Sequence, residues 1–300
     1  MNITLTGASG LIGRRLLKNL SAAGHGLHVL SRHAGTNLPP GVGISAWDPM
    51  KGPPPAEGMS NANVVIHLAG EPVAQRWSDA AKQRIRESRV VGTRHLVQGL
   101  AQLRNKPQAL VCASAIGYYG GRGDEILRET SEPAHGFLPE VCVAWEREAE
   151  AAEALGIRVV RVRTGIVLDG RGGALQRMLT PFRMGVGGKL GDGKQWMSWI
   201  HLADLAALFQ FAVENQVRGV FNGVAPNPVS NAGFTQELAK AVHRPAIFPV
   251  PAFALKLLFG EMAEMLLASQ RIVPAAAEAA GFKFRFPELP GALTDILRAP

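Results

Sequence analysis

Three glycines, at positions 7, 10 and 13, stand at a spacing suited to holding phosphate. They follow the apolar run from Ile3 to Leu5 and precede a helix-like run from Leu11 to Leu20. A strand, a glycine turn and a helix in this order direct free backbone N–H groups at an anion. Gly7 allows the tight turn, Gly10 leaves room for a pyrophosphate, and Gly13 lets helix and strand pack closely. The pattern predicts a dinucleotide site, with contacts from Thr6, Gly7, Ser9, Gly10, Leu11, Ile12 and Gly13.

The residues after the second expected strand indicate which dinucleotide is bound. An acid there binds the ribose 2′-hydroxyl of NAD(H), whereas an arginine accommodates the 2′-phosphate of NADP(H). The segment from Leu30 to His33 has no acid; Arg32 is a fork-shaped donor suited to phosphate, and Ser31 can add a hydroxyl bond. We therefore predict NADP(H), with a merely solvated Arg32 as the alternative. Small residues ending a later strand are also expected to approach the cofactor, unless they form only a packing turn: Leu68, Ala69 and Gly70.

Composition limits the class of protein. The chain has 300 residues, 47% of them hydrophobic, which is enough for one large domain or two joined ones. The formal net charge is +8, but the basic residues are dispersed, which disfavours nucleic-acid binding. The sequence shows no membrane helix, no export signal and only two cysteines, Cys112 and Cys142. We expect a cytoplasmic protein with a small-molecule substrate, no membrane partner and no metal, since no His or Cys pair has ligand spacing.

Strand and helix signals alternate through the first half of the chain. Strands are expected at 2–6, 26–31, 43–47, 63–68, 109–114 and 157–163, and helices at 11–23, 78–104 and 138–155. Repeated βα units of this length imply a parallel sheet with right-handed crossovers and helices on both faces. The predicted fold class is therefore α/β: a Rossmann-type doubly wound parallel sheet with a smaller C-terminal substrate lobe.

The second half of the chain has a different composition, with a glycine-rich stretch from Gly170 to Gly193 and no second phosphate loop. Helices are expected at 174–183, 200–215, 233–243 and 252–268, the last of them apolar, and a strand at 219–224. We divide the chain into an NADP(H)-binding domain at 1–168, to which 200–225 return, and a substrate lobe at 169–300.

Several segments together resemble one family: Thr6–Gly13, His67–Glu71, Ser114–Gly120, Val141–Glu146, Arg163–Leu168, Ser198–Leu205, Asn222–Pro226, Gln270–Pro274 and Gly281–Phe282. On these residues the chain resembles the extended short-chain dehydrogenases/reductases. More narrowly, it is similar to the atypical epimerase-like subgroup labelled SulA-like, which ends in a small domain of unknown function. The resemblance covers nearly the whole chain and implies a Rossmann-type domain that binds NADP(H). It also implies that Arg89 and Val167 lie near the cofactor; a solvated helix charge is the alternative for Arg89.

One feature of that superfamily is missing. Most members use a Tyr-x-x-x-Lys pair with a Ser or Thr to move a proton while hydride passes to or from nicotinamide. Aligned on Glu146, this chain has Leu138 in place of the tyrosine, Cys142 in place of the lysine and Ala115 at the hydroxyl position. The subgroup shares this loss, which disfavours an ordinary alcohol dehydrogenase or sugar epimerase.

Three hydroxyl groups near the fifth expected strand are candidates to replace the missing pair: Ser114, Tyr118 and Tyr119. They lie at the carboxyl edge, where ligands bind in such sheets. No nearby lysine is evident to tune either phenol, so packing is the alternative for the tyrosines and a strand-end cap for Ser114. Cys142 is expected to be a buried thiol rather than a nucleophile.

The segment from Lys189 to Trp199 mixes amide, cationic and aromatic groups in a glycine setting, as the wall of a cleft would. Lys194 and Gln195 are predicted to hold a polar substrate and Trp196 to stack on it; a structural loop is the alternative. His201 is expected either to line the cleft or to orient the helix that follows it.

Two functions remain open from the sequence. The first is an NADP(H)-dependent oxidoreductase of unusual mechanism, acting on a small polar substrate. The second is a non-enzymatic NADP(H)-binding module that stabilises its own fold or reports redox state to a partner. The missing triad favours the module, and the cleft-like segment in the second half favours the enzyme.

Overall fold

A seven-stranded sheet with the strand order β3-β2-β1-β4-β5-β7-β11 forms the centre of the molecule. Every neighbouring pair in it is parallel. Its strands are β1 Asn2–Thr6, β2 Gly26–Ser31, β3 Gly43–Ala46, β4 Val64–His67, β5 Ala109–Ala115, β7 Arg158–Thr164 and β11 Gly219–Gly223. The order reverses between β1 and β4, which opens a crevice at the carboxyl ends of these two strands. The predicted Rossmann-type sheet is confirmed.

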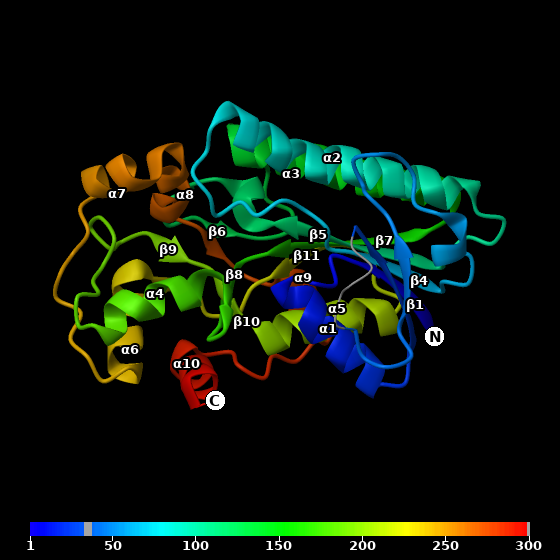
Figure 1. Cartoon of the computed structure of the whole chain (residues 1–300). Coiled ribbons are helices and arrows are strands. Elements are labelled where there is room, and N and C mark those ends of the chain that lie inside the picture. Colours follow the sequence, from blue (N-terminus) through cyan, green and yellow to red (C-terminus); the bar gives the residue numbers. More distant parts are fainter. Residues whose placement is uncertain (33–37, 299–300) are drawn as a thin grey trace.

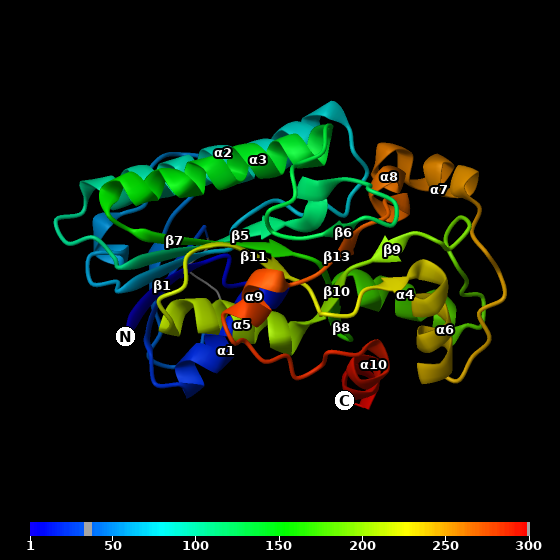
Figure 2. The same ribbon diagram turned by 180° about the vertical axis from the view of Figure 1, so that it is seen from behind.

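Helices cover both faces of this sheet (Figures 1 and 2). On one face lie α2 Asp79–Gln102 and α3 Phe137–Glu150; on the other lie α1 Leu11–Ala22, α5 Leu202–Glu214 and α9 Ala275–Ala279. Helix α1 buries Leu16, Leu17 and Leu20, which share one side at helical spacing. Helix α2 starts at Ser78, whose hydroxyl accepts the Ala81 N–H at 3.2 Å.

A second group of elements lies beyond the carboxyl edge of the sheet (Figure 1). It contains β8 Ile166–Asp169, α4 Gly173–Arg183, β9 Trp196–Met197, β10 Trp199–His201, β12 Val229–Ser230, α6 Asn231–Ala241 and α10 Leu289–Arg298. Their buried side chains form a core of their own around Trp199, Phe234 and Leu293. This is the smaller C-terminal lobe that the composition predicted.

The prediction of one continuous apolar helix over 252–268 is wrong. It divides into α7 Ala252–Phe259, a 3₁₀ turn Gly260–Met262 and α8 Ala263–Leu267. The break falls at Gly260, whose φ of 60° is left-handed and ends α7. The helix expected from residue 200 also begins later, because Trp199–His201 is a strand that pairs with β8.

The structure, a computed structural model, describes residues 1–32 and 38–298. His33, the last residue of the segment expected to choose the dinucleotide, lies outside the described residues. The remaining elements are short: 3₁₀ turns at Ala56–Gly58, Ile116–Tyr119 and Ala151–Leu155, and strands β6 Ile126–Leu127 and β13 Arg271–Ile272. None of the described helices combines the length and the apolar character that crossing a bilayer requires.

The segment that precedes α10 returns to the sheet. Ala277 of α9 and Phe282 belong to the same buried cluster as Leu16 of α1 and Phe209 of α5. The cofactor half of the molecule is therefore completed by residues close to the C-terminus.

Candidate cofactor and substrate site

The glycine turn after β1 leaves no room for side chains at two of its three glycines. Gly7 has a φ of +71°, and a Cβ there would lie 2.7 Å from the carbonyl carbon of Leu68. A Cβ at Gly13 would lie 2.3 Å from the Gly7 carbonyl oxygen. A Cβ at Gly10 would meet only that same oxygen, at 3.3 Å, so its outer side stays open. Gly7 and Gly13 set the shape of the turn, and Gly10 leaves a ligand space to approach it.

The first turn of α1 offers free N–H groups to this open space. Its N-cap, Gly10, supplies no side chain to cap the helix, and the first turn carries no acid. Ser9 and Gly10 are exposed, and the exposed Arg14 donates from its guanidinium to the Ser9 carbonyl. The N–H groups of Leu11 to Gly13 have no acceptor within the helix, as at any helix start. A helix N-terminus without cap or acid, with a cation beside it, suits a diphosphate.

Thr6, the last residue of β1, holds the turn that follows β4. Its hydroxyl oxygen accepts the backbone N–H groups of Leu68 (3.1 Å) and Ala69 (3.2 Å). The hydroxyl proton is thus left for His67 Nδ1 at 2.8 Å, and His67 Nε2–H donates to Thr93 at 3.1 Å. Burial lowers the pKa of His67 to about 4. The fully buried Thr6 therefore positions the β4 turn, and the structure does not support the direct cofactor contact predicted for it.

The residues expected to choose between the dinucleotides end β2, the strand beside β1. Arg32 is exposed, and Ser31 is half-buried. Because β1 and β2 are parallel neighbours, their carboxyl ends meet at one edge of the sheet. The guanidinium of Arg32 is thus on the same edge as the glycine turn.

Arg89 of α2 is held at the crevice by its neighbours. Its Nη1 donates to the carbonyl oxygens of Glu71 (2.9 Å) and Ile85 (3.1 Å). The guanidinium carbon lies 5.2 Å from the centre of the Trp145 ring and 3.4 Å from where a Cβ at Gly70 would stand. Arg89 is therefore not the solvated helix charge that the sequence left open; it is a fixed cation beside the β4 turn.

A cavity of about 580 Å³ begins at this crevice and extends toward the C-terminal lobe. Five predicted site residues line it: Leu11, Ile12, Arg89, Val167 and Trp196. Ala115, Leu138 and Cys142, which stand in place of the superfamily's triad, line it too. The sequence alignment thus located the wall correctly, and that wall carries no Tyr-Lys pair. Burial raises the pKa of the Cys142 thiol to about 12, as expected for a packed cysteine.

Ser114, Tyr118 and Tyr119 do not line this cavity. Ser114 is buried and donates to Glu146 at 2.6 Å. Both oxygens of that carboxylate accept from Arg163 at 2.8 Å, and Arg163 also donates to the Tyr119 hydroxyl at 2.9 Å. These contacts make Ser114 and Tyr119 part of a buried polar network whose members do not line the cavity.

The two tyrosines are also poor acids. The ring of Tyr118 packs under the Arg163 guanidinium, 3.4 Å from its central carbon. Tyr119 is fully buried and donates to Asn222 at 2.7 Å. Burial raises the pKa of Tyr119 to about 12 and raises that of Tyr118 as well. The structure therefore supports the packing alternative for both side chains.

Of the predicted substrate residues, only Trp196 reaches the cavity. Gln195 is buried and donates to the Leu190 carbonyl at 3.1 Å. Lys194 is exposed outside the wall. His201 caps α5: its Nδ1 accepts the Ala203 N–H at 3.0 Å. The other ring nitrogen of His201, Nε2, lies 3.4 Å from the Asp295 carboxylate. Gln195 and His201 are therefore engaged within the protein and do not line the cavity, which supports the structural alternative for both.

Several wall residues were not predicted from the sequence. They come from the segment after β4, from the start of α3, from α4 and from α8: Val73, Trp77, Phe137, Met178, Met265 and Leu266. The rings of Trp77 and Phe137 meet edge to face, with centroids 5.2 Å apart. These segments are far apart in sequence, so only the fold brings them together.

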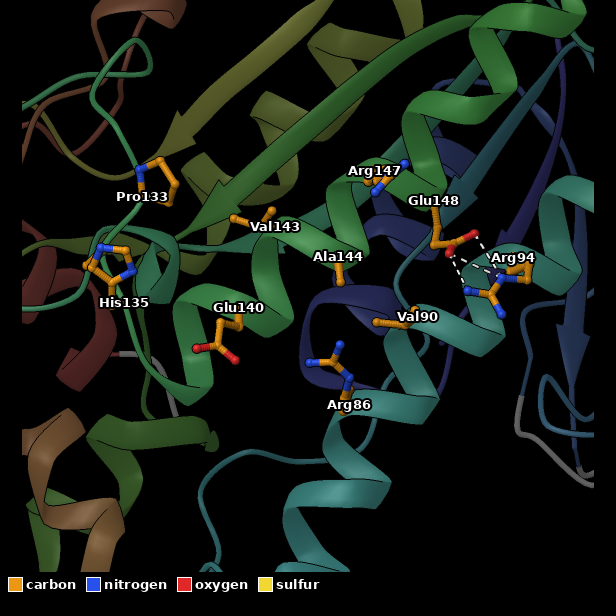
Figure 3. A pocket seen from close by; sticks show the side chains of 11 residues that line it. Arg86, Val90, Arg94, Pro133, His135, Glu140, Val143, Ala144, Arg147 and Glu148 are labelled. Atoms are coloured by element: carbon orange, nitrogen blue, oxygen red, sulfur yellow. Dashed lines mark hydrogen bonds and ion pairs between the residues drawn. The ribbon is translucent and has the colours of Figure 1, made fainter.

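A second hollow, about 780 Å³, lies on the outer side of α2 and α3 (Figure 3). Arg86 and Arg94 of α2 face Glu140 and Glu148 of α3 there, and Arg94 Nη2 lies 2.6 Å from Glu148. It contains none of the predicted site residues. The crevice at the glycine turn is therefore the candidate site.

Comparison with known proteins agrees with this placement. The family model described as the NAD dependent epimerase/dehydratase family matches residues 3–224, which include the turn, the β4 end and β7. The chain belongs to this family. Residues 250–296 match a further model, a domain of unknown function (DUF1731). The chain is thus an atypical extended short-chain dehydrogenase/reductase, as its motifs indicated.

Relatives within the family match along the whole chain. An epimerase family protein of Bacillus subtilis, YfhF, is 36% identical over 299 residues, covering 99% of this chain and 98% of the relative. The crystal structure of human epimerase family protein SDR39U1 with NADPH superposes with a TM-score of 0.90 at 33% identity, covering 100% of both chains. A nucleoside-diphosphate sugar epimerase of Corynebacterium glutamicum is 39% identical with a TM-score of 0.81, covering 99% of this chain and 58% of that one.

Proposed function

We propose that this chain binds NADP(H) and transfers hydride between the nicotinamide and a carbonyl or alcohol substrate in the adjoining cavity. The observation that carries the proposal is the continuity of the site. The uncapped start of α1, the fixed cation Arg89 and the cavity wall form one crevice at the carboxyl edge of the sheet. The human relative was crystallised with NADPH, which supports the same cofactor here.

Each part of the crevice has a task in this proposal. The N–H groups of Leu11 to Gly13 hold the diphosphate, assisted by Arg14. Arg32 binds the 2′-phosphate, because a guanidinium offers paired donors to phosphate oxygens. Arg89 and the backbone of Val167 hold the nicotinamide half. When bound, NADP(H) supplies the hydride acceptor or donor.

The proton in this proposal comes from solvent. The usual tyrosine and lysine positions are Leu138 and Cys142, and the Cys142 thiol, with a pKa of about 12, holds its proton at neutral pH. The tyrosine hydroxyls lie outside the cavity wall. His135 and Glu264 also line the cavity, but no hydrogen bond to another described residue positions either of them. With water as the proposed proton donor, turnover is expected to be slow compared with enzymes that carry the full triad.

The replacement of the tyrosine and lysine by Leu138 and Cys142 also favours a second candidate, a non-enzymatic NADP(H)-binding module. A cavity wall without a tuned acid would serve binding as well as it serves slow reduction. A panel of aldehydes, ketones and enones, screened for oxidation of NADPH, separates the two. No turnover across the panel, together with firm NADPH binding, would leave the binding module as the function.

The choice of cofactor has its own test. We expect NADPH to bind at least tenfold tighter than NADH, and Arg32→Ala to remove most of that difference. Loss of a charge-assisted phosphate contact costs about 1.5–3 kcal/mol, which is enough for such a ratio. Isothermal titration calorimetry with both cofactors measures it.

Arg14→Ala is the matched control, because it removes another exposed arginine near the site. Arg14 lies beside the diphosphate position common to both cofactors, so this variant should weaken NADPH and NADH alike. Equal affinities of the unaltered protein for the two cofactors would contradict the role given to Arg32.

A further inference from the structure

We propose that the cavity takes an apolar carbonyl compound, such as a medium-chain ketone or aldehyde, and not a nucleotide sugar or another polar substrate. The inference rests on the proposed function, since it concerns the space beside the nicotinamide position. It replaces the small polar substrate expected from the sequence.

The cavity is walled by large apolar side chains from four separate segments. They are Trp77 after β4, Phe137 and Leu138 at the start of α3, Met178 of α4, and Met265 and Leu266 of α8. All six are only partly buried within the chain. Their uncovered area faces the cavity, which is the surface a bound apolar molecule would remove from water.

Most polar side chains in the wall already have partners within the protein. Asn231 Oδ1 accepts the Leu190 N–H at 2.7 Å, and its Nδ2 lies 3.3 Å from the Met197 sulfur. The Ser198 hydroxyl donates to the Gln270 carbonyl at 2.7 Å and accepts the Ile272 N–H at 2.9 Å. Neither side chain is free to replace the water around sugar hydroxyls, and leaving such hydroxyls unpaired is costly.

Three further side chains of the wall are also engaged. The Thr164 hydroxyl donates to the Val162 carbonyl at 3.3 Å. Trp196 Nε1 donates to Asp124 at 2.7 Å, and Gln270 Nε2 donates to the Ile116 carbonyl at 2.9 Å. Among the described residues, two polar groups of the wall stay open: the side-chain carbonyl oxygen of Gln270 and the exposed imidazole of His135. Two such groups cannot satisfy a ring of sugar hydroxyls together with a diphosphate.

The charge of the wall also argues against a sugar nucleotide. Among the described residues that line the cavity, only Arg89 and Glu264 carry a full charge. Arg89 is held at the cofactor end by the Glu71 and Ile85 carbonyls, and Glu264 is an exposed carboxylate that would repel a diphosphate. A nucleoside diphosphate normally needs arginine or lysine partners for its phosphates.

The reaction that fits this space is reduction of a carbonyl group. The carbonyl carbon accepts the hydride of NADPH, the C=O π bond opens, and the oxygen takes a proton from solvent. The products are an alcohol and NADP⁺. NADPH is the only reductant required, and no charged group of the substrate needs a partner in the wall.

Binding can be measured without turnover, because a ketone cannot be reduced in the presence of NADP⁺. We would titrate octan-2-one, butan-2-one and UDP-glucose into the NADP⁺-loaded protein by calorimetry. Each buried methylene strengthens binding roughly fourfold. Octan-2-one has four more methylenes than butan-2-one, and burial of only two or three of them should make it bind at least about thirtyfold tighter. UDP-glucose should give no heat of binding.

Substitutions in the cavity wall test whether the ketone binds there. Leu266→Asn and Met178→Gln alter the wall from two different helices and should each weaken octan-2-one about tenfold or more. Leu257→Asn, on α7, is the matched control, since Leu257 is 78% exposed and lies outside the cavity. All three should keep the NADP⁺ affinity and the melting temperature of the unaltered protein; if one wall variant fails to fold, the other still decides.

The outcomes separate this inference from the proposed function. Octan-2-one binding no tighter than butan-2-one, or UDP-glucose binding tighter than either, would overturn the inference even if NADP⁺ binds well. If NADP⁺ does not bind, the proposed function fails. The same ketone titrations into the unloaded protein then decide the chemistry of the cavity by themselves.

Discussion

At the scale of single residues, the site depends on side chains that hold the backbone rather than on side chains that face a ligand. Thr6 fixes two N–H groups of the β4 turn, and His67 links it to Thr93 of α2. The sequence marked Thr6 as a cofactor contact because of its place beside the glycines. It could not show that the hydroxyl points down into the β1–β4 junction, since that depends on His67, 61 residues away.

The buried His67 makes a prediction about pH. Its pKa is lowered from 6.5 to about 4, so the unfolded chain binds a proton at a higher pH than the folded one. The contribution of neutral His67 to the free energy of unfolding is therefore fully present above pH 6.5. It is lost as the pH falls toward 4. Between pH 7 and pH 5 the free energy of unfolding should fall by about 2 kcal/mol through this group alone.

Urea denaturation of the unaltered protein and of His67→Gln at pH 7 and pH 5 measures this loss. The variant should be less stable at pH 7, because its hydrogen bonds to Thr6 and Thr93 fit less well, but it should lose about 2 kcal/mol less on acidification. The same pH dependence in both proteins would show that His67 does not stay neutral in the fold.

For the predicted catalytic hydroxyls, the sequence indicated their position in the fold but not their hydrogen-bond partners. Ser114 and Tyr119 were placed correctly at the carboxyl edge of β5. Their partners, Glu146, Arg163 and Asn222, come from three other elements. From the sequence alone, Arg163 on β7 would be interpreted as a solvated charge at a strand. Only the packing of α3 on β5 and β7 turns it into a buried ion pair that occupies both hydroxyls.

At the scale of elements, the junction between β1 and α1 depends on glycine in two different ways. A Cβ at Gly13 would lie 2.3 Å from the Gly7 carbonyl oxygen and 2.7 Å from the Ala8 Cα, so α1 would have to move. Gly13→Ala should therefore lower both the melting temperature and NADPH affinity. Gly10→Ala should leave the melting temperature within a few degrees and still weaken NADPH binding tenfold or more, because its methyl group enters the ligand's side of the turn.

Calorimetry with NADPH and thermal unfolding measure both variants. Gly291→Ala is the control: Gly291 lies inside α10 with no atom near its missing Cβ, and alanine there should stabilise by up to about 1 kcal/mol. If Gly13→Ala folds and binds as well as this control, the close contact in the turn has no consequence.

The sequence predicted the long elements well and the short ones poorly. The central strands β4 and β5 are nearly continuous apolar runs, which are typical of buried parallel strands. The strands β6, β9, β12 and β13 have two residues each and exist only because a distant partner lies beside them. β6 pairs with β13 across the chain, and no local pattern announces such a pair. The break at Gly260 did have a local signal, a glycine inside an apolar helix pattern.

The same reasoning explains which parts of the site were found. The glycine turn is a local motif, so residues 7–13 revealed it. The cavity wall is assembled from α3, α4, α8 and the segment after β4. The apolar residues that these segments contribute are typical of an ordinary core, so no local pattern marks them. The polar segment from Lys189 to Trp199 looked like a substrate wall, but its amide group satisfies its own loop.

At the scale of the whole molecule, the two halves share buried surface. The segment after the C-terminal lobe's first helices returns to the sheet, where Phe282 meets Phe211 of α5 edge to face at 5.6 Å and Phe284 at 4.9 Å. Phe282 is 7% exposed and belongs to the cluster beneath β1. The predicted boundary near residue 168 therefore separates two cores that are covalently and physically tied.

This arrangement predicts cooperative unfolding. Phe282→Ala removes a buried ring and should cost about 3–5 kcal/mol, and it should destabilise both halves together because the ring lies where the chain's end joins the cofactor-binding sheet. Urea unfolding followed by tryptophan fluorescence and by far-UV circular dichroism should give coincident transitions before and after the substitution.

Phe253→Ala, at a residue 74% exposed, should change stability by less than about 0.5 kcal/mol. Separate transitions for the two probes, or a Phe282 effect as small as that of Phe253, would mean that the lobe and the sheet fold independently. The cofactor crevice between them would then have to be stabilised by the dinucleotide itself, which would appear as merging of the two transitions when NADPH is added.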